Sequence, residues 1–130
     1  MTEKKNIRNG SVRRDRLLPI SILLILFGTM VPGMGHFEIQ LPHLDKVAHF
    51  ALFFFFSINI CFRYQSDRRL EVMLWAIFFG LMTEVIQQFI PGRDMDLYDG
   101  IADVFGVIMG FYAYKHFQKQ LDKILLMFGA

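Results

Sequence analysis

The chain has 130 residues, a length that allows one domain, and 54% of its residues are hydrophobic, including 15 phenylalanines. The mean hydropathy of +0.37 indicates a lipid bilayer as the surrounding solvent. A net charge of +2 is too small to predict nucleic-acid binding, and a single cysteine, Cys61, excludes a disulfide within the chain.

The N-terminal segment is polar and basic over residues 1–16, which predicts a cytoplasmic tail held near anionic lipid headgroups. The apolar run Leu17–Val31 follows it. A basic flank and an apolar run also occur in signal peptides, but no small-residue cleavage site follows this run. We therefore interpret Leu17–Val31 as an uncleaved first helix, with Pro19 in the first turn, where proline is tolerated.

Three further apolar segments occur along the chain: Val47–Phe62, Leu70–Ile90 and Ile101–Tyr114. With flanking residues added, each approaches the ~20 residues that cross a bilayer. From Lys115 on, lysines recur every four residues, which is typical of an amphipathic helix at a membrane surface. The expected fold is all-α. It is an integral membrane four-helix bundle over residues 17–116, followed by an amphipathic cytoplasmic tail over 117–130 that forms an interfacial helix.

The distribution of basic residues predicts an orientation. Twelve of the fourteen lysines and arginines lie in the two terminal tails and the second loop (63–69). The first loop (34–46) and the third loop (91–93) hold one each, Lys46 and Arg93. Because basic residues favour the cytoplasmic side, we expect a multi-pass protein of the cell inner (plasma) membrane with both termini in the cytoplasm. The first and third loops then lie on the external side.

Two polar stretches, 45–49 and 84–103, fall on this external side. Ionisable groups at membrane depth are costly and usually face a bundle interior or a watery cavity, so they are candidates for function. Helical spacing places three sets of them on common faces: Asp45 with His49, Glu84 with Gln87 and Gln88, and Asp99 with Asp103. We expect three helix ends to present these groups at one level of the membrane.

The carboxyl of Glu84 lies in an apolar segment, an environment that suits a general acid or base unless the group is paired. We assign catalytic roles to Glu84, His49 and Asp103. Substrate-binding roles are assigned to the other polar residues: Asp45, Lys46, Gln87, Arg93, Asp96 and Asp99. The alternative is that all of them form a buried ion-pair network that only stabilises helix packing.

His49 could relay protons or bind a metal ion, but a lone histidine in a helix is more often a hydrogen-bonding group. We therefore expect no metal and no cofactor. The run 94–100 has some features of a calcium loop, yet its fifth position is Tyr98 and no closing glutamate follows. Asp96 or Asp99 could instead cap the last membrane helix.

Gly106 and Gly110 form a GxxxG pattern, which lets two helices approach closely. Asp103 lies on the same helix face, so close packing would press its carboxyl against the neighbouring helix. Packing within the chain is one reading of this pattern, and a homo-oligomer formed through Gly106 and Gly110 is another.

The polar stretches resemble the VanZ-like family of small membrane proteins. The resemblance spans Leu41 to Tyr114 and rests on these residues: Asp45-Lys46, His49-Phe50, Glu84, Gln87, Phe89, Pro91-Gly92-Arg93, Asp96, Asp99, Asp103 and Gly106. It implies a four-helix membrane protein of bacterial type. In members that accompany resistance clusters, it implies a link to low-level resistance to the glycopeptide teicoplanin. The resemblance supplies no catalytic assignment, and Asp103 stands where the family often has asparagine.

The expected function is to bind or modify the headgroup of an anionic membrane lipid or a lipid-linked cell-wall precursor at the external membrane face. Lys46 and Arg93 would hold its phosphate, Arg93 through two parallel hydrogen bonds. One alternative is a non-enzymatic structural or partner-binding protein, and another is a subunit of a small ion-coupled transporter. The sequence leaves open whether the chain is an enzyme.

Overall fold

The computed structural model describes residues 2–30, 43–64 and 68–128, with side chains described from Arg16 onward. Within these ranges every regular element is a helix, which confirms the all-α prediction. The four helices are α1 (Thr2–Met30), α2 (Leu44–Arg63), α3 (Arg69–Gln87) and α4 (Leu97–Met127). By length and composition α2 and α3 could each cross a membrane, and Arg16–Met30 of α1 is a shorter apolar helix.

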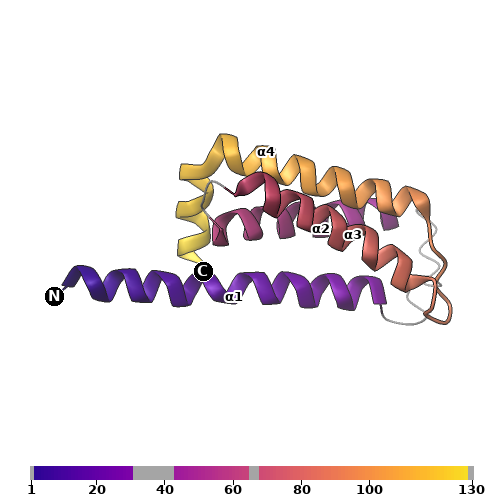
Figure 1. Cartoon of the computed structure of the whole chain (residues 1–130), viewed down its shortest axis with the longest axis horizontal. Helices are drawn as coiled ribbons and strands as arrows, with labels where there is room; N and C mark the ends of the chain where they lie inside the picture. Colours follow the sequence, from indigo (N-terminus) through magenta and orange to yellow (C-terminus); the bar gives the residue numbers. More distant parts are fainter. Residues whose placement is uncertain (1, 31–42, 65–67, 129–130) are drawn as a thin grey trace.

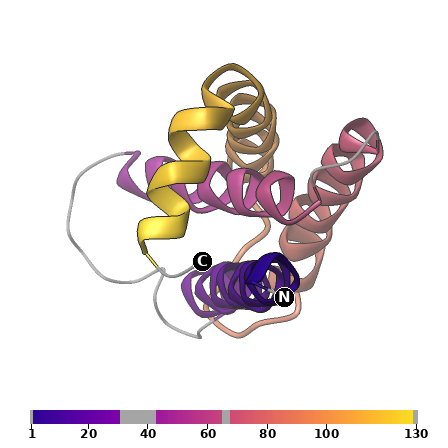
Figure 2. The same cartoon turned by 90° about the vertical axis from the view of Figure 1, so that its left-hand side faces the viewer.

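α1 and the first part of α4 run roughly along one direction (Figure 1), and α2 crosses them obliquely (Figure 2). The most extensive contact joins α2 to α4, while α1 packs mainly on α2, and α3 packs mainly on α4. The N-terminal part of α1 extends past the ends of the other helices (Figure 1). The segment predicted as a basic tail, residues 1–16, is thus helical from Thr2 and continuous with the apolar part of α1.

The turn between α3 and α4 forms where the sequence predicts it. Gly92 has a φ of 78°, a backbone conformation that glycine adopts without steric cost. α4 begins after Asp96, whose side chain accepts a hydrogen bond from the backbone N–H of Tyr98 at 2.8 Å, so Asp96 is the helix cap. Residues 34–42 of the predicted first loop and 65–67 of the second lie outside the described residues.

α4 continues past the predicted end of the bundle and kinks at Phe117, whose φ and ψ are −108° and 26°. Beyond the kink the helix turns across the end of the bundle toward α1 (Figure 2). Leu121 and Leu125 pack there on a core cluster that contains Phe62 and Tyr114. The lysines at 115, 119 and 123 are exposed, as expected for an amphipathic segment.

The glycines of the GxxxG pattern lie where α4 crosses α2. A Cβ atom on Gly106 would lie 2.5 Å from the backbone oxygen of Phe50, and one on Gly110 would lie 2.5 Å from that of Phe54. Ser57 adds a hydrogen bond to the backbone oxygen of Val107 at 2.8 Å. The close approach is therefore made within the chain. α2 covers both glycines, and a contact between copies through them remains a prediction.

The polarity of the bundle is inverted relative to that of a water-soluble domain. Large apolar side chains are exposed on every helix, including Phe27, Trp75 and Phe105 at 59–62%. The buried interior contains ionisable groups such as His49 and Glu84 beside its apolar core. This arrangement is the one expected where the outside of the bundle contacts lipid.

We predict different effects of alanine at two glycines of α4. Gly106→Ala should lower the free energy of unfolding by about 1–3 kcal/mol, because the new methyl group overlaps the α2 backbone. Gly100→Ala is the matched control, since its Cβ would lie 3.5 Å from Glu84 Cγ, an ordinary contact. Alanine favours a helix by up to about 1 kcal/mol over glycine, so this control should be neutral or stabilising. Unfolding in mixed micelles measures both, and equal effects would contradict the packing.

Candidate functional site

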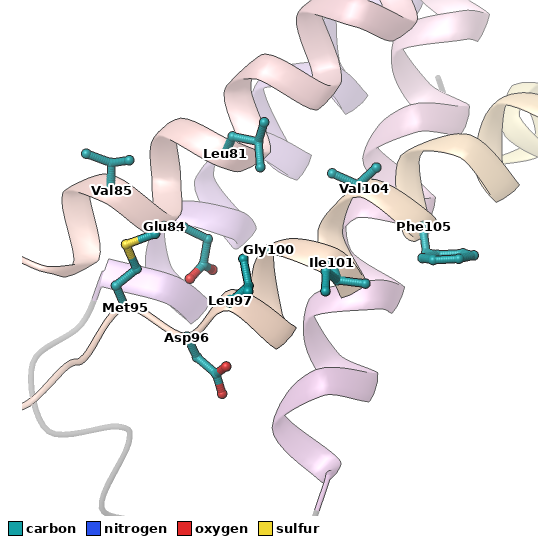
Figure 3. A pocket seen from close by; sticks show the side chains of 10 residues that line it. All are labelled: Leu81, Glu84, Val85, Met95, Asp96, Leu97, Gly100, Ile101, Val104 and Phe105. Atoms are coloured by element: carbon teal, nitrogen blue, oxygen red, sulfur yellow. The ribbon is translucent and has the colours of Figure 1, made fainter.

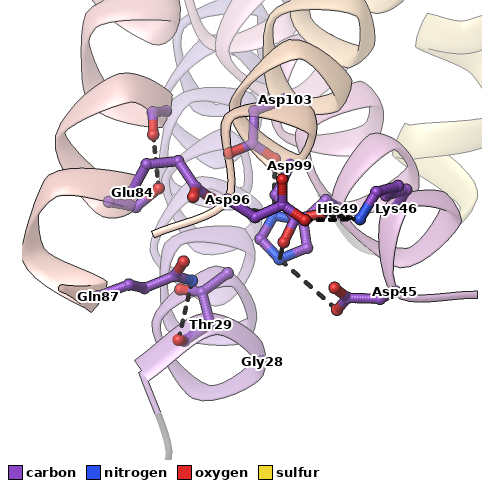
Figure 4. Close-up of polar contacts among 12 residues, drawn as sticks. Gly28, Thr29, Asp45, Lys46, His49, Glu84, Gln87, Asp96, Asp99 and Asp103 are labelled. Atoms are coloured by element: carbon purple, nitrogen blue, oxygen red, sulfur yellow. Dashed lines mark hydrogen bonds and ion pairs between the residues drawn. The ribbon is translucent and has the colours of Figure 1, made fainter. Parts of the chain in front are cut away.

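The polar residues of the two stretches come together at one end of the bundle, as the sequence predicts. The first turns of α2 and α4 meet the last turns of α1 and α3 there (Figure 4). Seven predicted site residues form one connected cluster, which we name the acidic cluster: Asp45, Lys46, His49, Glu84, Asp96, Asp99 and Asp103.

The centre of the acidic cluster is a hydrogen bond between His49 Nδ1 and Asp103 Oδ1, which are 2.9 Å apart. His49 is 3% exposed and Asp103 is fully buried. Gly106 lies one helical turn after Asp103, and the close approach that it allows brings the Asp103 carboxyl to the imidazole. This contact confirms that close packing presses Asp103 against a neighbouring helix.

Glu84 completes the buried side of the cluster from α3. Its Oε1 lies 3.6 Å from His49 Nδ1, and the residue is 3% exposed. Among the described residues, neither carboxyl oxygen of Glu84 has a hydrogen-bond partner, and Asp103 Oδ2 has none either. Buried polar atoms without partners carry a desolvation cost of about 1–3 kcal/mol each, so they are uncommon in folded proteins.

The other side of the imidazole faces two more carboxylates. His49 Nε2 lies 3.9 Å from Asp99 Oδ2 and 4.0 Å from Asp45 Oδ1. Lys46 contacts the same region, with its Nζ 3.2 Å from Asp99 Oδ1 and 2.8 Å from Asp96 Oδ2. The ammonium of Lys46 is thus held between two carboxylates at the edge of the cluster.

Gln87 and Arg93, also predicted as site residues, lie apart from this cluster and bind the end of α1. Gln87 Nε2 donates to the backbone oxygen of Thr29, and an Arg93 guanidinium N–H donates to that of Gly28, both at 2.9 Å. Sequence reasoning did not identify Gly28 and Thr29, because a backbone acceptor has no residue signature. The polar Thr29 within an apolar run was the one available signal.

A cavity of about 370 Å³ opens between α3 and α4 beside the cluster (Figure 3). We name it the α3–α4 groove. Its surface is almost entirely apolar, and the residues that line it are Leu81, Glu84, Val85, Met95, Asp96, Leu97, Gly100, Ile101, Val104 and Phe105. The sequence did not predict this groove, since its apolar residues have the same spacing as lipid-facing positions.

Two overlapping sets of side chains could hold a metal ion. His49, Glu84 and Asp103 each offer one ligand atom, and these atoms lie within 4.8 Å of one another. Asp45, His49 and Asp99 meet the same criterion, with Asp45 exposed. The acidic cluster therefore has the groups for proton transfer through His49 and Glu84, and also donor groups of the kinds that metals bind in proteins.

We predict that Asp96 makes part of the stability dependent on pH. The hydrogen bond from Lys46 and the N–H of Tyr98 hold the pKa of the Asp96 carboxyl below its usual range. Its stabilising effect is present above the unfolded pKa, at about 4, and is lost as pH falls through the lower folded pKa. Thermal unfolding should show Asp96→Asn less stable than wild type at pH 7, with a gap that shrinks below pH ~4. A gap that is constant with pH would contradict this pairing.

Comparisons with known proteins place the chain in a family. A family model described as VanZ/LLP1 matches residues 2–118, a range that contains the whole acidic cluster. The chain is also 28% identical over 118 residues to an uncharacterized protein of Schizosaccharomyces pombe, an alignment that covers 87% of this chain and 72% of the yeast protein. No solved structure matches the chain. The chain belongs to the VanZ/LLP1 family, as its resemblance to VanZ-like proteins predicts.

Proposed function

We propose that the chain is a multi-pass protein of the inner (plasma) membrane and that its acidic cluster faces the external side. The lengths of α2 and α3, the apolar part of α1 and the inverted polarity of the bundle support a membrane location. The clustering of lysines and arginines in the tails and the second loop supports cytoplasmic termini. The end of the bundle that carries the cluster then lies at the level of the outer headgroups.

At that level the protein binds the headgroup of an anionic lipid or a lipid-linked cell-wall precursor and acts on it by acid–base chemistry. The observation that carries this proposal is the position of Glu84, which belongs both to the buried cluster and to the wall of the α3–α4 groove (Figure 3). A hydrocarbon chain lying in the apolar groove would place its headgroup beside Glu84. A volume of about 370 Å³ is within the range of ligand sites.

The residues of the cluster suit distinct roles in this function. The hydrogen bond to Asp103 orients the imidazole of His49, as a carboxylate does in catalytic triads. Glu84 has carboxyl oxygens that are free to accept or donate a proton. Arg93 is partly exposed at the same end of the bundle, where its positive charge can attract a phosphate, whereas the ammonium of Lys46 is held by Asp96 and Asp99.

The alternative function is structural, with the cluster serving only to fix helix packing. The unpartnered oxygens of Glu84 and Asp103 favour chemistry over this alternative, because buried polar networks that serve only stability are normally satisfied. A small ion-coupled transporter is the remaining alternative. It would require several copies of the chain, since one four-helix chain offers little room for a transport path.

We predict that Glu84→Gln abolishes activity while the protein still accumulates in the membrane. Glutamine keeps the shape of the side chain but cannot exchange a proton. The measurement is mass spectrometry of membrane lipids and cell-wall precursors in cells that lack the protein or express each variant. A lipid species should change with wild type only. Glu71→Gln, on an exposed glutamate at the opposite end of α3, is the control and should behave as wild type. Full activity of Glu84→Gln would exclude acid–base chemistry at this residue.

We predict that filling the α3–α4 groove also abolishes activity. Ile101→Trp places an indole in the groove, so a hydrocarbon chain should no longer fit. Met109→Trp is the matched control, because Met109 lies on the same helix, is 50% exposed and does not line the groove. The lipid comparison described for Glu84 serves as the readout. Equal activity of the two tryptophan variants would show that the groove does not hold the substrate.

The link to glycopeptide resistance follows if the ligand is a cell-wall precursor. Expression of the wild-type chain in a teicoplanin-sensitive bacterium should then raise the inhibitory concentration of teicoplanin, and Glu84→Gln should not. Lipid changes without a change in teicoplanin sensitivity would favour a membrane lipid as the substrate.

A further inference from the structure

We infer that His49, Glu84 and Asp103 bind one divalent transition-metal ion, with His49 Nδ1 and one oxygen of each carboxylate as ligands. This inference goes beyond the proposed function, and it stands on the acidic cluster alone. Three different helices supply the ligands: α2, α3 and α4.

The distances between the donor atoms fit a small metal ion. Zinc bonds of about 2.0–2.2 Å in tetrahedral geometry place neighbouring ligand atoms roughly 3.4 Å apart. His49 Nδ1 and Glu84 Oε1 are 3.6 Å apart, and the atoms of all three residues lie within 4.8 Å of one another. Asp103 Oδ1 is 2.9 Å from Nδ1 in the metal-free chain, so the metal would replace the hydrogen bond between these two atoms and move them apart by about 0.5 Å.

Burial supplies an independent reason for a cation at this point. Glu84 is 97% buried, and both of its carboxyl oxygens lack a hydrogen-bond partner among the described residues, as does Asp103 Oδ2. Figure 4 shows Glu84 and Asp103 approaching His49 from two different helices. A dication would neutralise the two carboxylates and give their oxygens partners, whereas one protonated histidine compensates a single charge.

The types of donor indicate which metal would bind. One imidazole with two carboxylates suits Zn²⁺ or a similar transition metal, while Mg²⁺ and Ca²⁺ prefer sites made entirely of oxygen. A histidine that binds a metal through one ring nitrogen usually donates the other N–H to a carboxylate. Asp99 and Asp45 lie 3.9 and 4.0 Å from His49 Nε2, on the side where such an acceptor is needed.

Three protein ligands leave a fourth position of a tetrahedral zinc ion open, as in catalytic zinc sites. Because Glu84 also lines the α3–α4 groove, the ion would lie next to that groove. Five carboxylates and only Lys46 and His49 form the acidic cluster, a balance that by itself repels a phosphate. A metal ion would reduce this repulsion. This last step rests on the proposed function.

The experiment uses the full chain in detergent micelles, purified through a tag without histidine and stripped of metal with a chelator. Calorimetric titration with Zn²⁺ should give one bound ion per chain. Co²⁺ should give the visible absorption bands of a tetrahedral site. Glu84→Gln and Asp103→Asn should each weaken Zn²⁺ binding by at least about tenfold. Asp94→Asn is the matched control, because Asp94 is an exposed carboxylate at the same end of the bundle, and it should bind as wild type does.

Thermal unfolding distinguishes a variant that lacks a metal ligand from a variant that does not fold. Zn²⁺ should raise the unfolding temperature of wild type and of Asp94→Asn but not that of Glu84→Gln. If a ligand variant does not fold, Asp99→Asn keeps all three ligands and should bind about tenfold more weakly. Absence of saturable Zn²⁺ and Co²⁺ binding by the folded wild type, or equal affinity in all variants, would overturn the metal site. Zinc binding without any lipid change in cells would instead contradict the proposed function alone.

Discussion

The hydrogen bond between His49 and Asp103 is the contact on which the rest of the structure depends. It joins α2 to α4, the pair of helices with the most extensive contact, and it lies beside the close crossing at Gly106. A side chain at Gly106 would push the helices apart and separate the buried imidazole from its carboxylate. Both groups would then lose their partner in an apolar environment, which is strongly destabilising. The close packing at Gly106 and the contact between His49 and Asp103 therefore depend on each other.

Much of this arrangement can be predicted from the sequence because helical spacing determines which side chains share a face. The spacing identified Asp45 with His49 and Asp99 with Asp103, and the turn at Gly92 and the Asp96 cap have clear residue signatures. Spacing does not determine how helices rotate against one another. It therefore could not predict that Arg93 and Gln87 bind backbone oxygens of α1, or that α3 and α4 leave a groove beside Glu84.

The inverted polarity of the bundle explains why so much charge can gather at one end. Apolar side chains cover the outside, while the carboxylates are compensated inside by Lys46 and His49. That compensation is incomplete, since the buried oxygens of Glu84 have no partner among the described residues. The range that the VanZ/LLP1 family model matches contains all residues of the acidic cluster. An incompletely satisfied buried cluster next to an apolar groove is typical of a binding site rather than a packing device.

The most direct test of this account is a double-mutant cycle on the unfolding free energies of His49→Gln, Asp103→Asn and the double variant. If the two side chains form the buried hydrogen bond, removing the second partner should cost much less once the first is absent. The predicted interaction energy is about 0.5–3 kcal/mol. Strictly additive effects would mean that His49 and Asp103 do not meet in the folded protein. The description of the acidic cluster beside the groove, and the metal site proposed from it, would then be wrong.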